Sequence, residues 1–430
     1  MGHLYVGIGR QRITPKIGGH LAGYGTDVFS ASVHDDLTAT ALVLQQNDLS
    51  AIWICETVCN LSGALVDEIK SEIRKKHPVP AENIMIAAIH THSGPIVNSG
   101  AGWGDVDREY CDSIFIPQTL AAVDEAFSQM REAYMGVQET ESLVGINRRE
   151  YGPDGVVDFG QNPWGQQDKR MTVIAFQTPD GAPIANVVHY GAHCTAAGTN
   201  TEITRDWAGV MIDRLEAESG APTLFLNGAA GDVGPRLTNG KTKGDINYVM
   251  ELGSVAAQDA VRAYRAIRSY HTVHFQAVSG ALALPYDPVP PLCEAQTGLA
   301  KYNALPDTNV HLRMRDYYGR IVRAYQEGLP TEKAKKINET AFLLGDVVLV
   351  PFGFELFSEI SQRLRAYSPY PYTLAVGYAN EALGYLPSQD QICRGGYEVE
   401  MFKTGGVQNL ADNTDSVLIQ QTLALINKLG

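Results

Sequence analysis

The chain has 430 residues, of which 44% are hydrophobic and 19% are charged. These proportions are typical of a soluble globular protein, and the length suffices for a large hydrophobic core in one large domain or two. The 34 lysines and arginines against 48 aspartates and glutamates give a net charge of −14. This charge argues against binding of nucleic acid or an anionic membrane through the whole surface.

The sequence offers no sign of export or of membrane insertion. No basic and apolar leader is visible at the start, and no run reaches the roughly 18 apolar residues of a membrane span. The cysteines form no Cys-x-x-Cys pair, so we expect reduced thiols, mostly in the core. These features predict a cytoplasmic protein that does not insert into membranes.

Strand and helix patterns alternate through the first half of the chain. The segment from Gly7 to Gly9 lacks the third glycine and the following helix of a dinucleotide-binding loop, so we interpret it as a turn. Strands are expected at residues 37–44, 51–55, 83–89, 133–147, 171–176 and 183–189, and helices at 61–77 and 107–131.

The second half continues this alternation and adds turn signals between adjacent strands. Residues 148–169 and 380–403 are predicted as long polar loops, which in compact domains are usually functional or disordered. Helices are expected at 207–219, 246–268, 312–326, 332–339, 355–367 and from 414 onward, and strands at 223–226, 271–284, 340–350 and 373–377. The whole pattern predicts an α/β (α+β) fold, with a mixed β-sheet core covered by helices, in a single domain of residues 1–430.

Two histidines after a predicted buried strand are the first sign of chemistry. Side chains two residues apart on an extended chain point to the same side, so His90 and His92 leave one face of the strand end. Neutral imidazole is the commonest protein ligand for zinc. Two ligands do not specify a metal site, and two hydrogen-bonded histidines in a turn are the alternative.

Two further strand ends carry residues that can bind a metal. His189 lies inside a strand pattern and is predicted to be a core histidine, whereas His193 follows a Gly-Ala kink that can turn its ring toward a pocket. Glu355 follows a predicted strand at 347–350. Because active sites built at strand ends draw on distant sequence positions, this dispersal is compatible with one catalytic site.

The sequence resembles the neutral, non-lysosomal ceramidases, through short strings that keep the family's order. These are Gly-Ile-Gly-Arg with Ile-Thr-Pro within 7–15, Gly-Tyr-Gly at 23–25, His-Asp at 34–35, His-Thr-His-Ser-Gly-Pro at 90–95, Ile-Asn-Arg at 146–148, the stretch 168–171, Gly-Ala-His-Cys-Thr at 191–195 and Asn-Gly-Ala-Ala-Gly-Asp-Val-Gly-Pro at 227–235. The resemblance implies one zinc ion (Zn2+) held by two histidines, a glutamate and a tyrosine. The matching residues are His90, His193, Glu355 and Tyr385, with Tyr378 as the competing tyrosine.

Supporting catalytic roles are expected for four residues. His92, on the same side as His90, is expected beside the attacking water, and Asp232 is expected to steady a histidine. Arg148 is a candidate to stabilise an oxyanion or to hold an anionic substrate group. Tyr397, in a Tyr-Glu pair similar to one in the family, is a candidate donor to the leaving nitrogen.

Two departures from the family bear on the chemistry. Gly234 stands where the family has a serine regarded as functional, so no nucleophile acts from that position. The sequence also shows neither the export signal nor the added C-terminal β-domain of the family's long forms. We therefore expect a small soluble substrate in place of a membrane lipid.

These observations predict a zinc-dependent hydrolase that cleaves an amide (N-acyl) bond of a small-molecule substrate by a metal-activated water. The alternatives are an ester, lactone or glycosidic-type bond, a zinc-binding protein without catalysis, and nucleotide binding through the Gly7–Gly9 turn. No nucleic-acid partner is expected, and homo-oligomerisation is left open. Candidates to line a pocket for a sugar-like or aromatic group are Trp103, Trp164, Trp207 and Tyr151.

Overall fold

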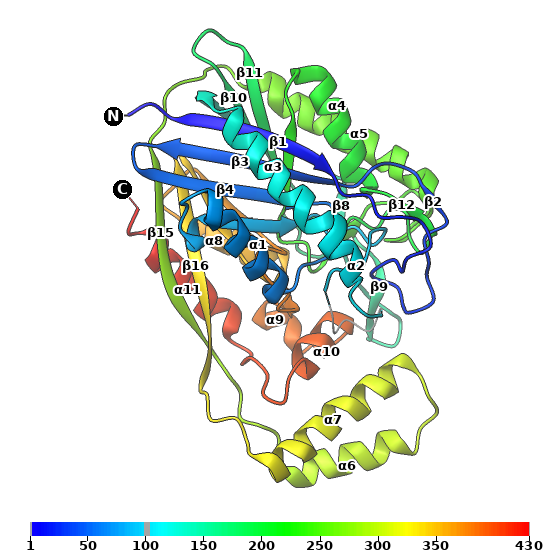
Figure 1. Cartoon of the computed structure of the whole chain (residues 1–430). Coiled ribbons are helices and arrows are strands. Elements are labelled where there is room, and N and C mark those ends of the chain that lie inside the picture. Colours follow the sequence, from blue (N-terminus) through cyan, green and yellow to red (C-terminus); the bar gives the residue numbers. More distant parts are fainter. Residues whose placement is uncertain (1, 99–103, 430) are drawn as a thin grey trace.

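A computed structural model describes residues 2–98 and 104–429. Two β-sheets that share one hydrophobic core form the centre of the molecule (Figure 1). The first sheet is mixed, because β4 and β5 run parallel while the other neighbours are antiparallel. Its five strands follow the order β5 (Ile84–Ala88), β4 (Leu49–Glu56), β3 (Thr38–Gln46), β1 (Tyr5–Arg12) and β6 (Arg131–Glu132).

The second sheet has four strands, of which only β11 and β13 run parallel. Its order is β13 (Thr223–Asn227), β11 (Pro183–Tyr190), β10 (Arg170–Gln177) and β7 (Tyr134–Glu141). The carboxyl ends of β13, β11 and β5 lead into the segments that hold the candidate site.

Helices cover the outer faces of these sheets. On the first sheet lie α1 (Gly63–Lys76) and α3 (Ile116–Ser128), and on the second lie α4 (Asp206–Ser219) and α5 (Ile246–Ala266). The helix α3 is preceded by α2 (Arg108–Tyr110) and by the π-helical turn η2 (Cys111–Phe115). The helix expected over residues 107–131 therefore exists, with an irregular first part.

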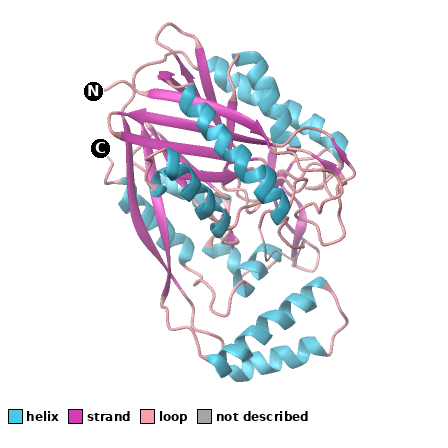
Figure 2. Ribbon diagram, viewed as in Figure 1, coloured by secondary structure: helices cyan, strands magenta, loops and turns pink. Residues whose placement is uncertain are grey.

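A third sheet completes the core. It contains β15 (Phe275–Pro285), β16 (Ala334–Leu344), β17 (Val347–Pro351) and β19 (Tyr372–Val376), and α8 (Ser358–Tyr367) and α11 (Thr414–Ile426) pack against it. Trp53 of β4 meets Phe342 of β16 edge to face, with ring centroids 5.7 Å apart. Between β15 and β16 the chain extends into a helical hairpin, α6 (Leu292–Asn303) and α7 (Asn309–Glu327), which projects from the body (Figure 2).

Short elements surround the strand ends. A three-stranded sheet joins β14 (Val233–Pro235), β8 (Gly145–Tyr151) and β9 (Val157–Asn162). Two-stranded pairs join β2 (Ser32–Val33) to β12 (Glu202–Ile203) and β18 (Glu355–Leu356) to β20 (Tyr385–Leu386). The remaining short helices are η1 (Ala81–Asn83), α9 (Gln389–Ile392) and α10 (Tyr397–Thr404).

The predicted mixed-sheet core with helical cover is confirmed, and several local expectations are corrected. The helix expected at 332–339 is wrong, because this stretch pairs with β15 as part of β16. The loop expected at 148–169 contains β9, and the loop expected at 380–403 contains β20, α9 and α10. In each case pairing or packing with distant residues decides the structure, which a local pattern does not report.

All six cysteines are free, and four of them are buried. Across residues 2–98 and 104–429, no helix is both long and apolar enough to cross a membrane.

Candidate metal centre

Three side chains from distant parts of the sequence converge at the ends of the strands. His90 follows β5, His193 follows β11, and Glu355 begins β18. The Oε2 atom of Glu355 lies 3.4 Å from Nε2 of His90 and 3.3 Å from Nε2 of His193. These three potential ligand atoms all lie within 4.8 Å of one another. The predicted set of two histidines and a glutamate is thus brought together.

The hydrogen bonds of both histidines direct a lone pair to the centre of this group. Nδ1 of His90 donates to the carbonyl of Cys59 at 2.7 Å, and Nδ1 of His193 donates to the carbonyl of Ala230 at 2.8 Å. A carbonyl can only accept, so Nδ1 carries the proton and Nε2 is the bare nitrogen. Within the described residues, Nε2 of His193 is buried without a hydrogen-bond partner. This arrangement is the one that zinc-binding histidines use.

The electrostatics of the group also suit a cation. Burial, with a further contribution from Arg148, lowers the pKa of His193 to about 3, and burial lowers the pKa of His90. Both rings are therefore neutral and able to bind a metal at neutral pH. Burial alone would raise the pKa of Glu355, whereas positive charge on its neighbours lowers that pKa; with both rings neutral, this charge is that of Arg148. Glu355 is an anion in the centre of the site.

The backbone is strained at His90 and at Tyr378, whose ring stacks on His90. His90 has φ of 69° and Tyr378 has φ of 56°, in the left-handed region that residues with a side chain seldom adopt. The two rings stack, with centroids 4.2 Å apart. Such strain, of order 1–3 kcal/mol per residue, is typical of functional sites whose geometry is fixed by the surrounding structure.

Asn227, at the end of β13, joins the backbone segments that carry the site. Its buried side-chain Nδ2 donates to the carbonyl of Ile89 at 2.9 Å and to the carbonyl of Ala192 at 3.2 Å. Its Oδ1 accepts from the amide of Ala192 at 3.2 Å. Its own carbonyl accepts from the amide of Gly377 at 2.9 Å. These three partners immediately precede His90, His193 and Tyr378 in the sequence.

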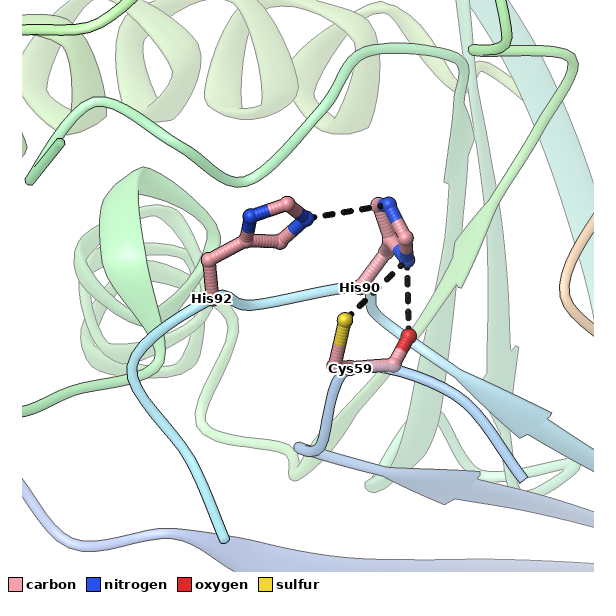
Figure 3. Close-up of side chains that lie close together, drawn as sticks. All are labelled: Cys59, His90 and His92. Atoms are coloured by element: carbon pink, nitrogen blue, oxygen red, sulfur yellow. Dashed lines mark hydrogen bonds between the residues drawn. The ribbon is translucent and has the colours of Figure 1, made fainter. Parts of the chain in front are cut away.

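His92 lies on the same side as His90, as the spacing predicts. Their Nε2 atoms are 3.2 Å apart (Figure 3). Gly23 packs against the ring of His92 so closely that a Cβ there would lie 2.2 Å from Nδ1. His92 is thus held at the edge of the ligand group by a residue from the loop after β1.

A second group of metal-capable atoms comprises Cys59, His90 and His92 (Figure 3). The Cys59 Sγ lies 3.7 Å from Nδ1 of His90. That nitrogen already donates to the Cys59 carbonyl and has no lone pair for a metal. Burial raises the pKa of the Cys59 thiol well above its usual range, which disfavours the thiolate that a metal binds. The group with His193 and Glu355 is the better metal site.

Both candidate tyrosines lie at the site, with different partners. The Tyr378 hydroxyl donates to Oε2 of Glu355 at 3.4 Å. The Tyr385 hydroxyl accepts from Nη2 of Arg148 at 3.0 Å, and Tyr385 pairs with Glu355 in the register of β18 and β20. Burial raises the pKa of both tyrosines well above the usual value. The geometry keeps both as candidates for a fourth ligand.

Arg148 faces the site and is balanced by a carboxylate that the sequence did not single out. Its Nε donates to Glu398 at 2.8 Å, and Arg149 donates to the other carboxylate oxygen of Glu398 at 2.7 Å. All three side chains are buried. The sequence signal that could have identified Glu398 as the partner of the arginines was the pair Arg148-Arg149 together with the distant pair Tyr397-Glu398. Tyr397 lies beside Tyr385, with ring centroids 5.8 Å apart.

Asp232 stabilises the turn that supports two ligands. Its carboxylate accepts from the amide and hydroxyl of Ser358, at 2.7 and 3.0 Å, and from Asn147 at 3.2 Å. Burial raises its pKa to about 7. In the same turn it is the carbonyls of Ala230 and Val233 that accept from His193. Asp232 thereby fixes the segment just after Glu355.

Gly234 has no room for a larger side chain. A Cβ there would lie 2.7 Å from the Cβ of Thr242. Thr242 therefore fills the space beside this position of β14.

A cavity of about 570 Å³ opens onto the metal-binding group. Its polar wall includes Tyr24, His90, His92, Arg148, Thr242, Lys243, Glu355, Tyr378 and Glu381, and its apolar wall includes Leu383, Met401, Phe402 and Leu410.

Three of the four predicted pocket aromatics lie outside the wall of this cavity. Trp164 and Tyr151 line a separate hollow of about 530 Å³. Trp207 is buried, and its Nε1 donates to the carbonyl of His193 at 3.0 Å. Trp103 lies outside the described residues. His189 is a core histidine, as predicted, and bonds to the carbonyl of Ala375 at 2.9 Å.

Comparison with known proteins identifies the family of the chain. The profile of the neutral/alkaline non-lysosomal ceramidase N-terminal region matches residues 4–247, which is more than half of the chain. The chain belongs to this family.

The curated relatives are similar over part of their length. Neutral ceramidase B of Dictyostelium discoideum is 24% identical over 250 residues, which cover 52% of this chain and 34% of that protein. Neutral ceramidase of Oryza sativa subsp. japonica is 23% identical over 231 residues, which cover 49% of this chain and 28% of that protein. The matches thus span about a third or less of these relatives.

A solved structure matches the whole fold. The neutral ceramidase of Pseudomonas aeruginosa superposes with a TM-score of 0.75 at 17% sequence identity. The match covers 100% of this chain and 75% of that chain. At this identity the likeness establishes the fold.

Replacing Asn227 with leucine should release the metal-binding segments. Leucine removes the side-chain hydrogen bonds of Asn227 and leaves the backbone groups of Ile89 and Ala192 buried without partners. Each unpaired group should lower the free energy of unfolding by about 1–3 kcal/mol. We expect metal affinity to fall by roughly tenfold or more, measured by competition with a chromophoric chelator.

The control is Asn186→Leu, at the other end of the same sheet. Asn186 is equally buried and donates to Ser219 at 2.7 Å, far from the site. This variant should lose comparable stability in urea unfolding while it keeps its metal affinity. An equal loss of metal affinity in both variants would contradict the role of Asn227.

Proposed function

We propose that this chain is a zinc-dependent hydrolase that cleaves an amide (N-acyl) bond of a small-molecule substrate. The observation that carries the proposal is the convergence of two neutral imidazole nitrogens and one ionised carboxylate within 4.8 Å, on a cavity of about 570 Å³. Membership of the ceramidase family supports the amide as the bond.

His90, His193 and Glu355 would hold the ion, with Tyr378 or Tyr385 as a fourth ligand. The fit rests on the two fixed Nδ1–H groups and on the buried Nε2 of His193, which has no hydrogen-bond partner among the described residues. Zinc supplies a Lewis acid, which makes water more acidic and polarises a carbonyl.

The surrounding residues take the positioning and proton-transfer roles. Nε2 of His92 lies 3.2 Å from Nε2 of His90, and His92 is uncharged because burial lowers its pKa well below the usual range. With the lone pair of His90 on a metal, Nε2 of His92 could form a hydrogen bond with the attacking water. Arg148, with Glu398 as its counterion, keeps a positive charge beside the carbonyl oxygen as negative charge develops there. Tyr397 at the cavity wall is the proposed proton donor to the leaving nitrogen.

A mechanism through an acyl-serine at position 234 is excluded from this proposal, because that residue is glycine. Asp232 is assigned a positioning role through Ser358 and the turn at 230–233. A cytoplasmic setting and a soluble substrate remain predictions from the sequence.

The second candidate is hydrolysis of an ester or lactone at the same centre, since the same residues can polarise any carbonyl. A panel of N-acyl amides, esters and lactones with matched acyl chains separates these activities. A zinc-binding protein without catalysis would turn over none of them.

Loss of either histidine ligand should remove the metal. We expect zinc content by plasma mass spectrometry to drop from about one ion per chain to a small fraction in His90→Ala and in His193→Ala, because each variant deletes one donor of a tetrahedral set. His311→Ala, at a half-buried residue of α7 outside the cavity wall, should keep full content and activity. If both ligand variants kept full zinc content, the assignment would be wrong.

The fourth ligand is identified by a pair of conservative variants. Tyr378→Phe and Tyr385→Phe each remove one hydroxyl and leave the packed ring in place. We expect the variant that deletes the ligand to lose roughly tenfold or more in zinc affinity, and the other to change little. Unchanged affinity in both would show that the site uses no tyrosine.

A further inference from the structure

We infer that the leaving amine of the substrate carries an anionic group, bound by Lys243, while the acyl half lies along the apolar wall of the cavity. The substrate class is then an N-acylated amino acid or an N-acyl compound with another oxyanion. This inference rests on the proposed hydrolase function and names its substrate.

Lys243 lies at one end of a row of neighbouring rings, and the candidate metal ligand His90 lies at the other end. Its Nζ lies 5.7 Å from the ring centroid of Tyr24. The Tyr24 ring is 5.0 Å from that of His92, and the His92 ring is 4.8 Å from that of His90. The ammonium group thus lies on the His92 side of the centre, at the exposed mouth of the cavity.

No carboxylate forms an ion pair with Lys243 in the part of the chain that the structure describes. The carboxylates of the cavity wall are Glu355, which faces the two histidines, and Glu381, which packs against Gly353. The cations of the wall are Arg148, Lys243 and Lys335. Glu398 balances Arg148, so Lys243 and Lys335 are the wall cations without a carboxylate partner among the described residues, and a bound divalent ion would add to their positive charge. The cavity therefore attracts an anionic group.

Another part of the cavity wall is suited to an alkyl chain. Leu383, just before β20, Met401 and Phe402 of α10, and Leu410 after α10 line it. Apolar walls with a few placed polar groups are the usual form of a small-ligand pocket, and about 570 Å³ lies in the range for one ligand. The cavity that opens onto the metal-binding group therefore offers both an apolar surface and the cation Lys243 to one substrate.

The reaction that follows is a simple hydrolysis. Water adds its oxygen to the acyl carbon, and the carbon–nitrogen bond breaks. One proton of the water passes to the leaving nitrogen, so a fatty carboxylic acid and a free amino acid are released. No oxidant or other co-reactant is needed.

The test compares anionic and neutral substrates that share one acyl chain. N-dodecanoylglycine, N-dodecanoyltaurine and N-dodecanoyl-phosphoethanolamine carry a carboxylate, a sulfonate and a phosphate, and N-dodecanoylethanolamine is neutral. We expect kcat/KM to favour an anionic substrate at least tenfold at low ionic strength, and the preferred anion identifies the group.

Substitution of the lysine should remove this preference. We expect the anionic-to-neutral ratio of kcat/KM to fall about tenfold in Lys243→Gln and further in Lys243→Glu. Lys241→Gln is the matched control, because Lys241 is exposed on the same turn and lies outside the cavity wall. An unchanged ratio in Lys243→Gln would overturn the inference.

A binding measurement separates this inference from the proposed function. In the ketone isostere of N-dodecanoylglycine a methylene replaces the amide N–H, so it cannot be hydrolysed. By calorimetry, wild-type protein should bind the acid about tenfold more tightly than its primary amide, and Lys243→Gln should bind both equally. Equal affinity of the wild-type protein for the acid and the primary amide would refute the inference. The proposed function would be refuted if the protein cleaved none of the N-acyl substrates.

Discussion

The side chain of Asn227 is the constraint on which the site depends. One buried amide bonds to the carbonyls of Ile89 and Ala192 and to the amide of Ala192, and the backbone of Asn227 accepts from Gly377. The residues that follow these partners carry the metal-binding rings and the stacked Tyr378. Because buried backbone groups must be paired, the three strand ends cannot separate without leaving polar groups unsatisfied. The spacing of the ligands therefore follows from the spacing of the strands.

Charge compensation gives the centre its second property. Glu398 pairs with both Arg148 and Arg149 inside the protein, so Arg148 retains a fixed position beside Tyr385. Breaking one partner of such a buried pair costs several kcal/mol, which keeps the arginine from turning outward. The site thus presents neutral imidazoles, one anionic ligand and a fixed cation, a combination that favours developing negative charge on a substrate oxygen.

The candidate ligands could be predicted from the sequence where a strand pattern runs directly into a residue that can bind a metal. His90 and His92 were visible because a buried strand runs directly into them, and His193 because a Gly-Ala kink follows another strand. Glu398 was missed as a counterion, since its arginines are about 250 residues away and no local spacing connects them. Part of the stretch at 334–344 was predicted as helix. This stretch is a strand because it pairs with β15, which lies about 50 residues earlier in the sequence, before the α6–α7 hairpin. The strain at His90 and Tyr378 is a property of the assembled fold and has no signature in residue type.

The central claim is that one metal ion binds between His90, His193 and Glu355 and not beside Cys59. X-ray absorption at the zinc edge of the zinc-loaded protein tests this directly. The claim predicts a first shell of nitrogen and oxygen alone at about 2.0–2.2 Å, with the outer scattering of two imidazole rings. A sulfur neighbour at about 2.3 Å would place the ion on Cys59 and contradict the claim.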